Sequence, residues 1–227
     1  MKTITVMVAG NTSSIIENKV GSKKNWYNQY LSGLNCKIKF LDIYSNTFSY
    51  DDNDDGWIIT GSECSAYDEF DWLDSFKKLL LKTINNNKPI LGICFGHQLL
   101  VDVLRGQVIK NPKGWEVGYS SVSLTKLGIE SPLFYDFPKV FDAAETHQDI
   151  VVKLPNECTK LAENKMGIQS FQYKNKVFGV QFHPEFDNQI MDAYIDMRNR
   201  NNIDVLYPQS KDISISHSIF NNFINLI

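Results

Sequence analysis

The stretch LGICFGHQLL, residues 91–100, joins a short apolar run to a segment with helical spacing, and it places one cysteine between two glycines. The spacing Gly92-x-Cys94-x-Gly96 is that of a nucleophile elbow, the sharp strand-to-helix turn described for G-x-S-x-G hydrolases. Glycines on both sides let the backbone turn where side chains would collide. We therefore expect a strand that ends at Cys94, a helix over 95–104, and a thiol at the carboxyl edge of a sheet.

Cys94 is a candidate nucleophile because it precedes the first turn of this helix. The field of a helix N-terminus favours the thiolate, so we expect the pKa of Cys94 to lie below the ordinary value of ~8.5. A free cysteine can equally be a small buried hydrophobe. The glycine spacing does not decide between the two roles, and a nucleophile also needs a base.

The candidate bases are the four histidines, His97, His147, His183 and His217. His183 ends an apolar run in VQFHPEF, residues 180–186. Residues two apart in extended chain point the same way, and Pro184 keeps the chain extended, so the Glu185 carboxylate can reach the His183 ring and fix its tautomer. Cys94, His183 and Glu185 thus supply a nucleophile, a base and a group that orients the base.

The first half of the chain alternates short apolar runs with longer periodic segments. We expect strands over 4–10, 37–44, 56–61 and 89–94, and helices over 23–34 and 67–86. Such alternation predicts an α/β fold, with a mostly parallel central sheet and helices on both faces. From Val117 the period shifts toward two, which adds mixed or antiparallel strands to the same sheet, including a hairpin over 168–182. An apolar stripe from Ile215 to Ile227 predicts a C-terminal helix.

Composition favours one ordinary globular domain over residues 1–227, with a core over about 3–190 and a C-terminal helical extension over about 187–227. The chain is 43% hydrophobic and carries a net charge of −3 without a basic cluster, which argues against nucleic-acid binding. The pair Lys23-Lys24 is expected on a solvated helix face. Cys residues without a CxxC pair predict no metal and no cofactor. No signal peptide and no apolar run of ~18 residues is found, so we expect a cytoplasmic protein that does not enter a membrane.

The motifs together resemble those of the class I, or triad-type, glutamine amidotransferases. The elbow GICFGHQLL and the segment FGVQFHPEF are similar to that family's two most specific signatures, in the same order. Further similar segments are IITGSECSAYD (58–68), GWEVGYSSVSLT (114–125) and ETHQDIVVKLP (145–155), so the resemblance covers most of residues 3–190. It implies a flavodoxin-like α/β core and the hydrolysis of a γ-glutamyl amide to glutamate and ammonia.

The resemblance also implies a role for each matching residue. Cys94 is the nucleophile, with His183 and Glu185 completing the triad through a γ-glutamyl thioester. The oxyanion is held by the N–H of Phe95 and by one from the turn at Gly61 or Ser62. The residues that match the family's substrate contacts are Gln98, His147, Gln148 and Asp149.

The chain departs from the family pattern at two places. Many members have Gly-Pro where this chain has Ser62-Glu63, and many ammonia-channelling members have glycine in place of Gln148. The THQD segment is more similar to the stand-alone branch of the family than to its ammonia-channelling members. The stand-alone branch includes enzymes that cleave γ-glutamyl peptides. The chain also resembles GMP synthase amidotransferase-like proteins.

Three functions therefore stay open from the sequence. The first is a glutaminase that releases ammonia, and the second is a hydrolase of other γ-glutamyl compounds. The third is a regulatory binder that has kept the fold, although an intact triad has no packing rationale. The sequence contains no P-loop for ATP-dependent activation, so a synthetase that accepts the ammonia must be a separate chain.

Overall fold

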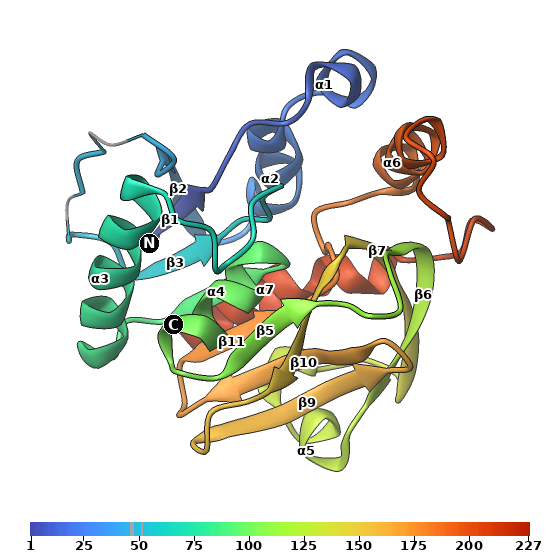
Figure 1. The fold of residues 1–227 in the computed structure, drawn as a ribbon. Helices are drawn as coiled ribbons and strands as arrows, with labels where there is room; N and C mark the ends of the chain where they lie inside the picture. Colours follow the sequence, from blue (N-terminus) through green and yellow to red (C-terminus); the bar gives the residue numbers. More distant parts are fainter. Residues whose placement is uncertain (46–47, 51) are drawn as a thin grey trace.

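The computed structural model describes residues 1–45, 48–50 and 52–227 (Figure 1). Within these residues a nine-stranded sheet has the order β2-β1-β3-β4-β11-β10-β9-β6-β7. Five neighbouring strands are parallel, namely β2 (Cys36–Asp42), β1 (Lys2–Val8), β3 (Gly56–Ile59), β4 (Ile90–Ile93) and β11 (Val177–Val180). Four strands continue the sheet with antiparallel pairing, namely β10 (Gly167–Tyr173), β9 (Cys158–Asn164), β6 (Glu116–Leu124) and β7 (Val140–His147). A separate antiparallel pair joins β5 (Gln107–Lys110) to β8 (Asp149–Lys153).

The expected α/β class is confirmed, because the order β2-β1-β3-β4 followed by a further parallel strand is that of the flavodoxin-like fold. The longer helices are α2 (Lys23–Leu31), α3 (Asp71–Asn85), α4 (Phe95–Val103), α6 (Asn188–Arg200) and α7 (Ser218–Leu226). The shorter ones are α1 (Ser14–Val20), α5 (Lys126–Ile129) and the 3-10 turns η1 (Pro132–Phe134) and η2 (Ser214–His217). None of the helices in the described residues is long and apolar enough to cross a membrane.

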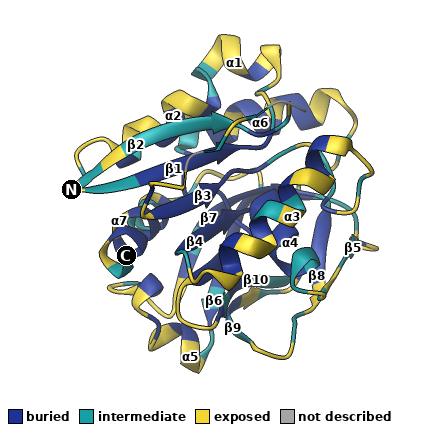
Figure 2. Ribbon diagram, turned by 90° about the vertical axis from the view of Figure 1, so that its left-hand side faces the viewer, coloured by how far each residue is buried: buried dark blue, intermediate teal, exposed yellow. Residues whose placement is uncertain are grey.

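Helices cover both faces of the parallel strands, as the alternating side chains of β3 show. Ile58 packs in one apolar cluster with residues of α2 and α7, whereas Trp57 and Ile59 pack in a second cluster with residues of α3 and α4. Because neighbouring strand residues point to opposite faces, one strand serves two cores. Figure 2 shows the result, a buried central sheet between helices whose outer faces are exposed.

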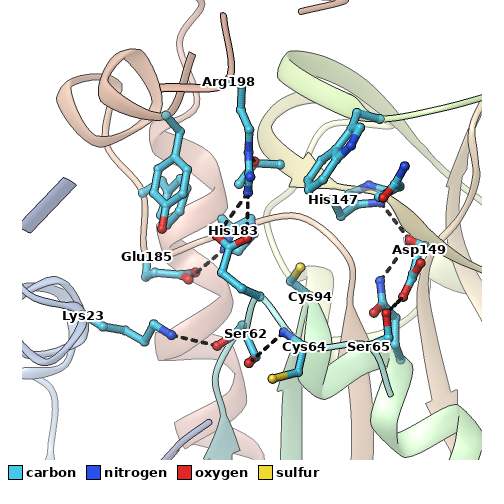
Figure 3. Close-up of a pocket in the computed structure, with 18 of the residues that line it drawn as sticks. Lys23, Ser62, Cys64, Ser65, Cys94, His147, Asp149, His183, Glu185 and Arg198 are labelled. Atoms are coloured by element: carbon cyan, nitrogen blue, oxygen red, sulfur yellow. Dashed lines mark hydrogen bonds and ion pairs between the residues drawn. The ribbon is translucent and has the colours of Figure 1, made fainter. Parts of the chain in front are cut away.

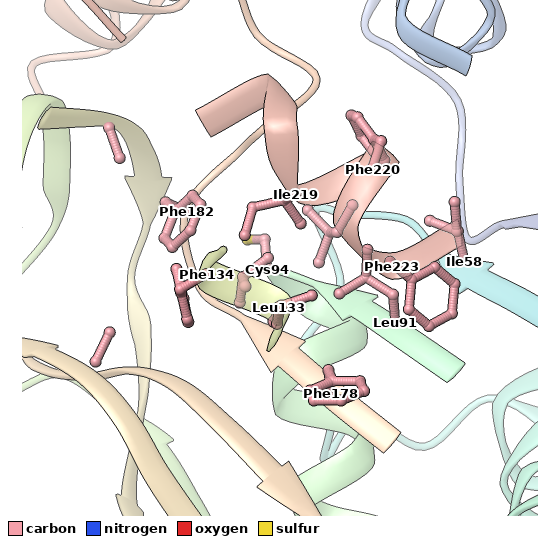
Figure 4. Close-up of a cluster of buried hydrophobic side chains, with 14 of the residues drawn as sticks. Ile58, Leu91, Cys94, Leu133, Phe134, Phe178, Phe182, Ile219, Phe220 and Phe223 are labelled. Carbon is pink, nitrogen blue, oxygen red and sulfur yellow. The ribbon is translucent and has the colours of Figure 1, made fainter. Parts of the chain in front are cut away.

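The C-terminal apolar stripe forms a helix as expected. Ile219, Phe220 and Phe223 of α7 are completely buried, and they pack in the same cluster as Leu91 of β4 and Phe178 of β11 (Figure 4). Burying a side chain of this size stabilises the fold by roughly 1.5–3 kcal/mol. The end of the chain therefore closes the core beneath the strand that carries the elbow.

Two boundaries differ from the sequence expectations. The helix expected from residue 67 begins at Asp71, because the Asp68 carboxylate accepts a hydrogen bond from the N–H of Ser65 at 2.8 Å and holds that segment in a turn. The small sheet of β5 and β8 was not expected, since its two strands lie far apart in the sequence. Helix α6, capped by Asp187 whose Oδ1 accepts from the N–H of Ile190 at 2.9 Å, fills the start of the expected helical extension.

Candidate active site

The elbow at Cys94 has the geometry that its glycines predict. Cys94 connects β4 to α4 with φ 51° and ψ −101°, a conformation that costs a non-glycine residue about 1–3 kcal/mol. A Cβ on Gly92 would meet the carbonyl oxygen of Gly96 at 2.4 Å, and one on Gly96 would meet that of Ile59 at 2.5 Å. Neither position accepts a side chain, so the backbone can pack closely enough to make the turn.

His183 and Glu185 lie just after β11, the strand next to β4. The N–H of His183 donates to the Ala144 carbonyl at 2.9 Å, and its Nδ1 lies 2.9 Å from Glu185 Oε1. A carboxylate only accepts, so Nδ1 carries the proton and Nε2 is the free base. Nε2 is buried and has no hydrogen-bond partner in the described part of the chain. The contact expected from the HPE spacing is present, but the extended chain expected at Pro184 is wrong: Pro184 and Glu185 form a turn in which the Phe186 N–H donates to the His183 carbonyl at 3.2 Å.

Gly61, which follows β3, lies next to both Cys94 and His183. A Cβ at this position would lie 3.0 Å from His183 Cε1 and 3.6 Å from Cys94 Cβ, so the bare backbone of Gly61 borders both side chains. One pocket is lined by Cys94, His183, Glu185, Gly61 and Ser62 (Figure 3). The ring of Phe95 packs instead against Trp72, which leaves only its backbone N–H for the expected role.

The peptide group after Gly61 is held by Lys23, which also lines the pocket. The Lys23 Nζ donates to the carbonyl oxygens of Gly61 and Gly10, both at 2.9 Å, and the Thr60 hydroxyl donates to Gly61 at 3.0 Å. In a planar trans peptide the N–H points opposite to the C=O, so the Ser62 N–H points away from Lys23. Among the described residues this N–H has no hydrogen-bond acceptor. It is a free donor beside Cys94.

The sequence predicts that Lys23 and Lys24 both lie on a solvated helix face. This prediction is wrong for Lys23, which is buried, and is confirmed for Lys24, which is exposed. Lys23 is only 8% exposed, because the inward face of α2 that carries Trp26 and Tyr27 also includes its first residue. Burial lowers the pKa of the Lys23 ammonium, and the carboxylates of Glu185 and Glu63 oppose that change. Sequence analysis missed this residue because nothing in the KK pair distinguishes its two members.

The pKa expected for Cys94 is also corrected. Burial of the thiol raises its pKa above the ordinary value, and the negative charges of Glu145 and Glu185 add to the effect, while a hydrogen bond from the Phe95 N–H opposes it. The side chain is 5% exposed. Desolvation therefore outweighs the field of the short helix α4, and a thiolate forms only when a base accepts the proton.

The remaining predicted substrate contacts, Gln98, His147, Gln148 and Asp149, line another side of the same pocket. The Asp149 carboxylate accepts from the Ser65 hydroxyl at 2.6 Å and from the Tyr67 hydroxyl at 3.0 Å. Gln98 Nε2 donates to the Asp149 carbonyl at 2.9 Å. The structure thus places a fixed, buried carboxylate where the resemblance implies that the substrate head binds.

His147 belongs to a buried cluster of charged side chains that also contains Glu116 and Glu145. Its Nε2 lies 3.2 Å from carboxylate oxygens of both Glu116 and Glu145, and its Nδ1 donates to the Asp149 carbonyl at 2.9 Å. Burial alone lowers the pKa of His147, but the two carboxylates raise it to about 10. Burial and the charge of Glu116 raise the pKa of Glu145 to about 8. A protonated His147 can donate from both ring nitrogens at once.

The same three side chains form a potential ligand set, although the sequence predicts no metal. Their ligand atoms lie within 4.8 Å of one another and all three residues are buried. Burial raises the pKa of Glu116, but the hydrogen bond and the positive charge of His147 lower it below the ordinary value, so a protonated His147 faces a Glu116 carboxylate. The sequence signal for the cluster was the spacing Glu145-x-His147, which places both side chains on one face of β7.

Fold and site together define an α/β protein with a cysteine elbow and a carboxylate-oriented histidine. Residues 15–198 match the family model described as glutamine amidotransferase class-I, and the chain belongs to that family. The γ-glutamyl peptidase 5 of Arabidopsis thaliana is 33% identical over 148 residues, which are 64% of this chain and 59% of the relative. A GMP synthase of Borreliella burgdorferi is 30% identical over 199 residues, 82% of this chain and 36% of the relative.

The chain therefore spans about three fifths of the length of that peptidase, as the 59% coverage shows. Among solved structures, a glutamine amidotransferase from Thermotoga maritima superposes with a TM-score of 0.78, at 21% identity, over 98% of this chain and 96% of the other. That likeness supports the fold.

Proposed function

We propose that the protein hydrolyses the γ-amide bond of a γ-glutamyl substrate, glutamine included, through Cys94, His183 and Glu185. The observation that carries the proposal is the position of Gly61, where a Cβ would lie 3.0 Å from His183 Cε1 and 3.6 Å from Cys94 Cβ. Nucleophile and base thus border the same turn, and the Ser62 N–H of that turn has no acceptor among the described residues. The family membership supports the same reaction class.

The reaction begins when Cys94 Sγ attacks the γ-carbonyl carbon and its proton passes to His183 Nε2. The raised pKa of Cys94 requires this transfer to accompany attack. The carbonyl oxygen becomes an oxyanion, which accepts hydrogen bonds from the N–H groups of Phe95 and Ser62. Glu185, bound to His183 Nδ1 at 2.9 Å, stabilises the imidazolium formed in this step.

His183 then returns the proton to the departing nitrogen, and the C–N bond breaks to leave a γ-glutamyl thioester on Cys94. A water molecule gives a proton to His183 and attacks the thioester, which releases glutamate and regenerates the thiol. The substrate head is held on the opposite wall by Asp149 and Gln98 in this proposal. No cofactor enters these steps.

The test is to supply the purified chain with glutamine and, separately, with a γ-glutamyl dipeptide, and to measure the glutamate released. Cys94→Ala is expected to abolish release from both substrates with an unchanged thermal midpoint. Cys64→Ala is the matched control, because Cys64 also lines the pocket but has no role in the proposed steps; its activity should equal that of the wild type. Near wild-type turnover by Cys94→Ala contradicts the proposal.

A second candidate is donation of ammonia to a separate synthetase chain. Similarity to a GMP synthase favours it, since that relative is described as glutamine-hydrolysing. Turnover of glutamine alone, increased by an added synthetase, would support this function. Turnover of the dipeptide by the isolated chain would support the peptidase alternative, and neither outcome changes the roles proposed for the triad.

A further inference from the structure

Arg198 of α6 is a buried cation in the pocket that the proposed mechanism does not use. It is 6% exposed, and it lines the same pocket as Cys94 and His183. Its guanidinium lies 4.2 Å from the centre of the Trp115 ring, and its Nε donates to the Thr146 hydroxyl at 3.3 Å. The side chain is therefore held from two directions before any ligand arrives, and a planar guanidinium fixed in this way is suited to bind a carboxylate.

A carboxylate of the protein already occupies this site. Arg198 Nη2 donates to Glu63 Oε1 at 3.1 Å and to Oε2 at 3.2 Å, whereas Nη1 makes no hydrogen bond to the described residues. The Glu63 side chain is 60% exposed, and it follows Ser62 in the loop after β3. An exposed carboxylate gains little from such a pair and can swing into solvent. Glu63 thus fills a carboxylate site without being fixed in it.

The position of Arg198 identifies which part of a substrate it meets. The rings of His183 and Phe186 stack at 4.3 Å, those of Phe186 and Tyr194 at 5.0 Å, and Arg198 lies 6.0 Å from the Tyr194 ring. In Figure 3, Arg198 and His183 lie to one side of Cys94, and Asp149 to the other. His183 protonates the departing nitrogen, so the leaving group extends along this row of rings toward Arg198.

We propose that Arg198 binds the carboxylate of an amino acid or peptide leaving group, so that the substrate class is γ-glutamyl amino acids and peptides. The substrate carboxylate takes the place of Glu63 on Nη2 and adds a bond to the free Nη1. Glutamine has no such group, and its ammonia leaves this subsite unused. This inference rests on the proposed function and adds the chemistry of the leaving group to it.

The test compares two substrates that differ only in this charge, γ-glutamyl-alanine and γ-glutamyl-alaninamide. We expect kcat/KM to favour the free acid by about ten- to a hundredfold, mainly through KM, because a charge-assisted hydrogen bond is lost with the amide. Arg198→Gln should reduce this preference to about threefold or less. Glu63→Gln should lower KM for the acid, since it removes the competing carboxylate.

Arg200→Gln is the control, because Arg200 is exposed on the same helix; it should keep the wild-type preference. A second readout does not need turnover: Cys94→Ala, which does not consume substrate, should bind the acid at least about tenfold more tightly than the amide by calorimetry. Equal kinetic constants and equal affinities for acid and amide overturn the inference. Absence of glutamate release by the wild type from every substrate, with the binding preference intact, overturns only the proposed function.

Discussion

Cys94 joins β4 to α4 with a φ of 51°, in the elbow between Gly92 and Gly96, and its thiol is buried. The raised pKa of the thiol could not be predicted, because its causes are burial and the charges of Glu145 and Glu185, which reach the site from β7 and from the turn after β11. Acidity depends on neighbours in space, and a single sequence does not specify them.

The pair His183 and Glu185 gives the first prediction at this scale. His183→Ala removes the base, so kcat should fall roughly 10⁴-fold or more. Glu185→Gln removes only the orientation and charge stabilisation of His183, so the fold-loss in kcat should be about a hundred times smaller than for His183→Ala. Steady-state glutamate release measures both. Equal and small losses in the two variants would contradict the roles assigned to them.

Lys23 gives the second prediction. Lys23→Met fills the same space but loses the two 2.9 Å hydrogen bonds that fix the Gly61 peptide. The Ser62 N–H then loses its alignment, and kcat should fall about ten- to a hundredfold with little change in KM, a smaller loss than deletion of an oxyanion donor. Lys24→Met is the matched control, since Lys24 pairs on the surface with Asp42 and should leave kcat unchanged. If the two variants have the same kcat, the positioning role is wrong.

At the scale of elements, strand and helix periodicity predicted the parallel half of the sheet well. The pairing of β6 with β7 could not be predicted from one sequence, although it places Glu116 opposite His147. That register creates the buried cluster with Glu145, because cross-strand neighbours on one face lie within ~5.5 Å. Local patterns identify strands, whereas the partner of each strand depends on the whole fold.

The β6–β7 cluster predicts how stability depends on pH. The folded-state pKa values of Glu145, about 8, and His147, about 10, both lie above their ordinary values. A raised pKa gives stability that is complete below the unfolded pKa and is lost as pH rises through the folded one. The free energy of unfolding should therefore fall between pH 6 and 10, by up to ~1.4 kcal/mol per pH unit for each proton retained.

Urea unfolding at several pH values measures this dependence. Glu145→Gln mimics the protonated acid, so its loss of stability between pH 6 and 8 should be smaller than that of the wild type. Glu130→Gln is an exposed control and should follow the wild-type curve. A wild-type stability that is constant or increases from pH 6 to 10 would exclude the cluster as the source of a pH effect.

At the scale of the molecule, residues from both halves of the chain meet at the carboxyl ends of β3, β4 and β11. The meeting of Cys94, His183 and Glu185 in one pocket was predictable, because they lie in two short motifs with distinctive spacing. The contact between Arg198 and Glu63 could not be predicted, since 135 positions separate them and nothing in the α6 sequence distinguishes Arg198 from Arg200. Sequence motifs therefore identified the groups that we propose to react, and the fold was needed to find the walls of the pocket.

The arrangement of the whole pocket predicts strict selection for the γ-linkage. The fixed Asp149 carboxylate, held by Ser65 and Tyr67, suits the free α-amino group of the substrate head on one wall, and Cys94 lies between that wall and His183 (Figure 3). In an α-linked glutamyl peptide the scissile carbonyl belongs to the head itself, so binding the head places the wrong carbon at Sγ. Competition between α-glutamyl-alanine and γ-glutamyl-alanine, which have identical composition, should show at least about a hundredfold preference for the γ-isomer, because a small misplacement of the reacting carbon costs about that much in rate. Comparable cleavage of the α-isomer would mean that the pocket positions the scissile bond by the leaving group alone, and that Asp149 has no part in selecting the substrate.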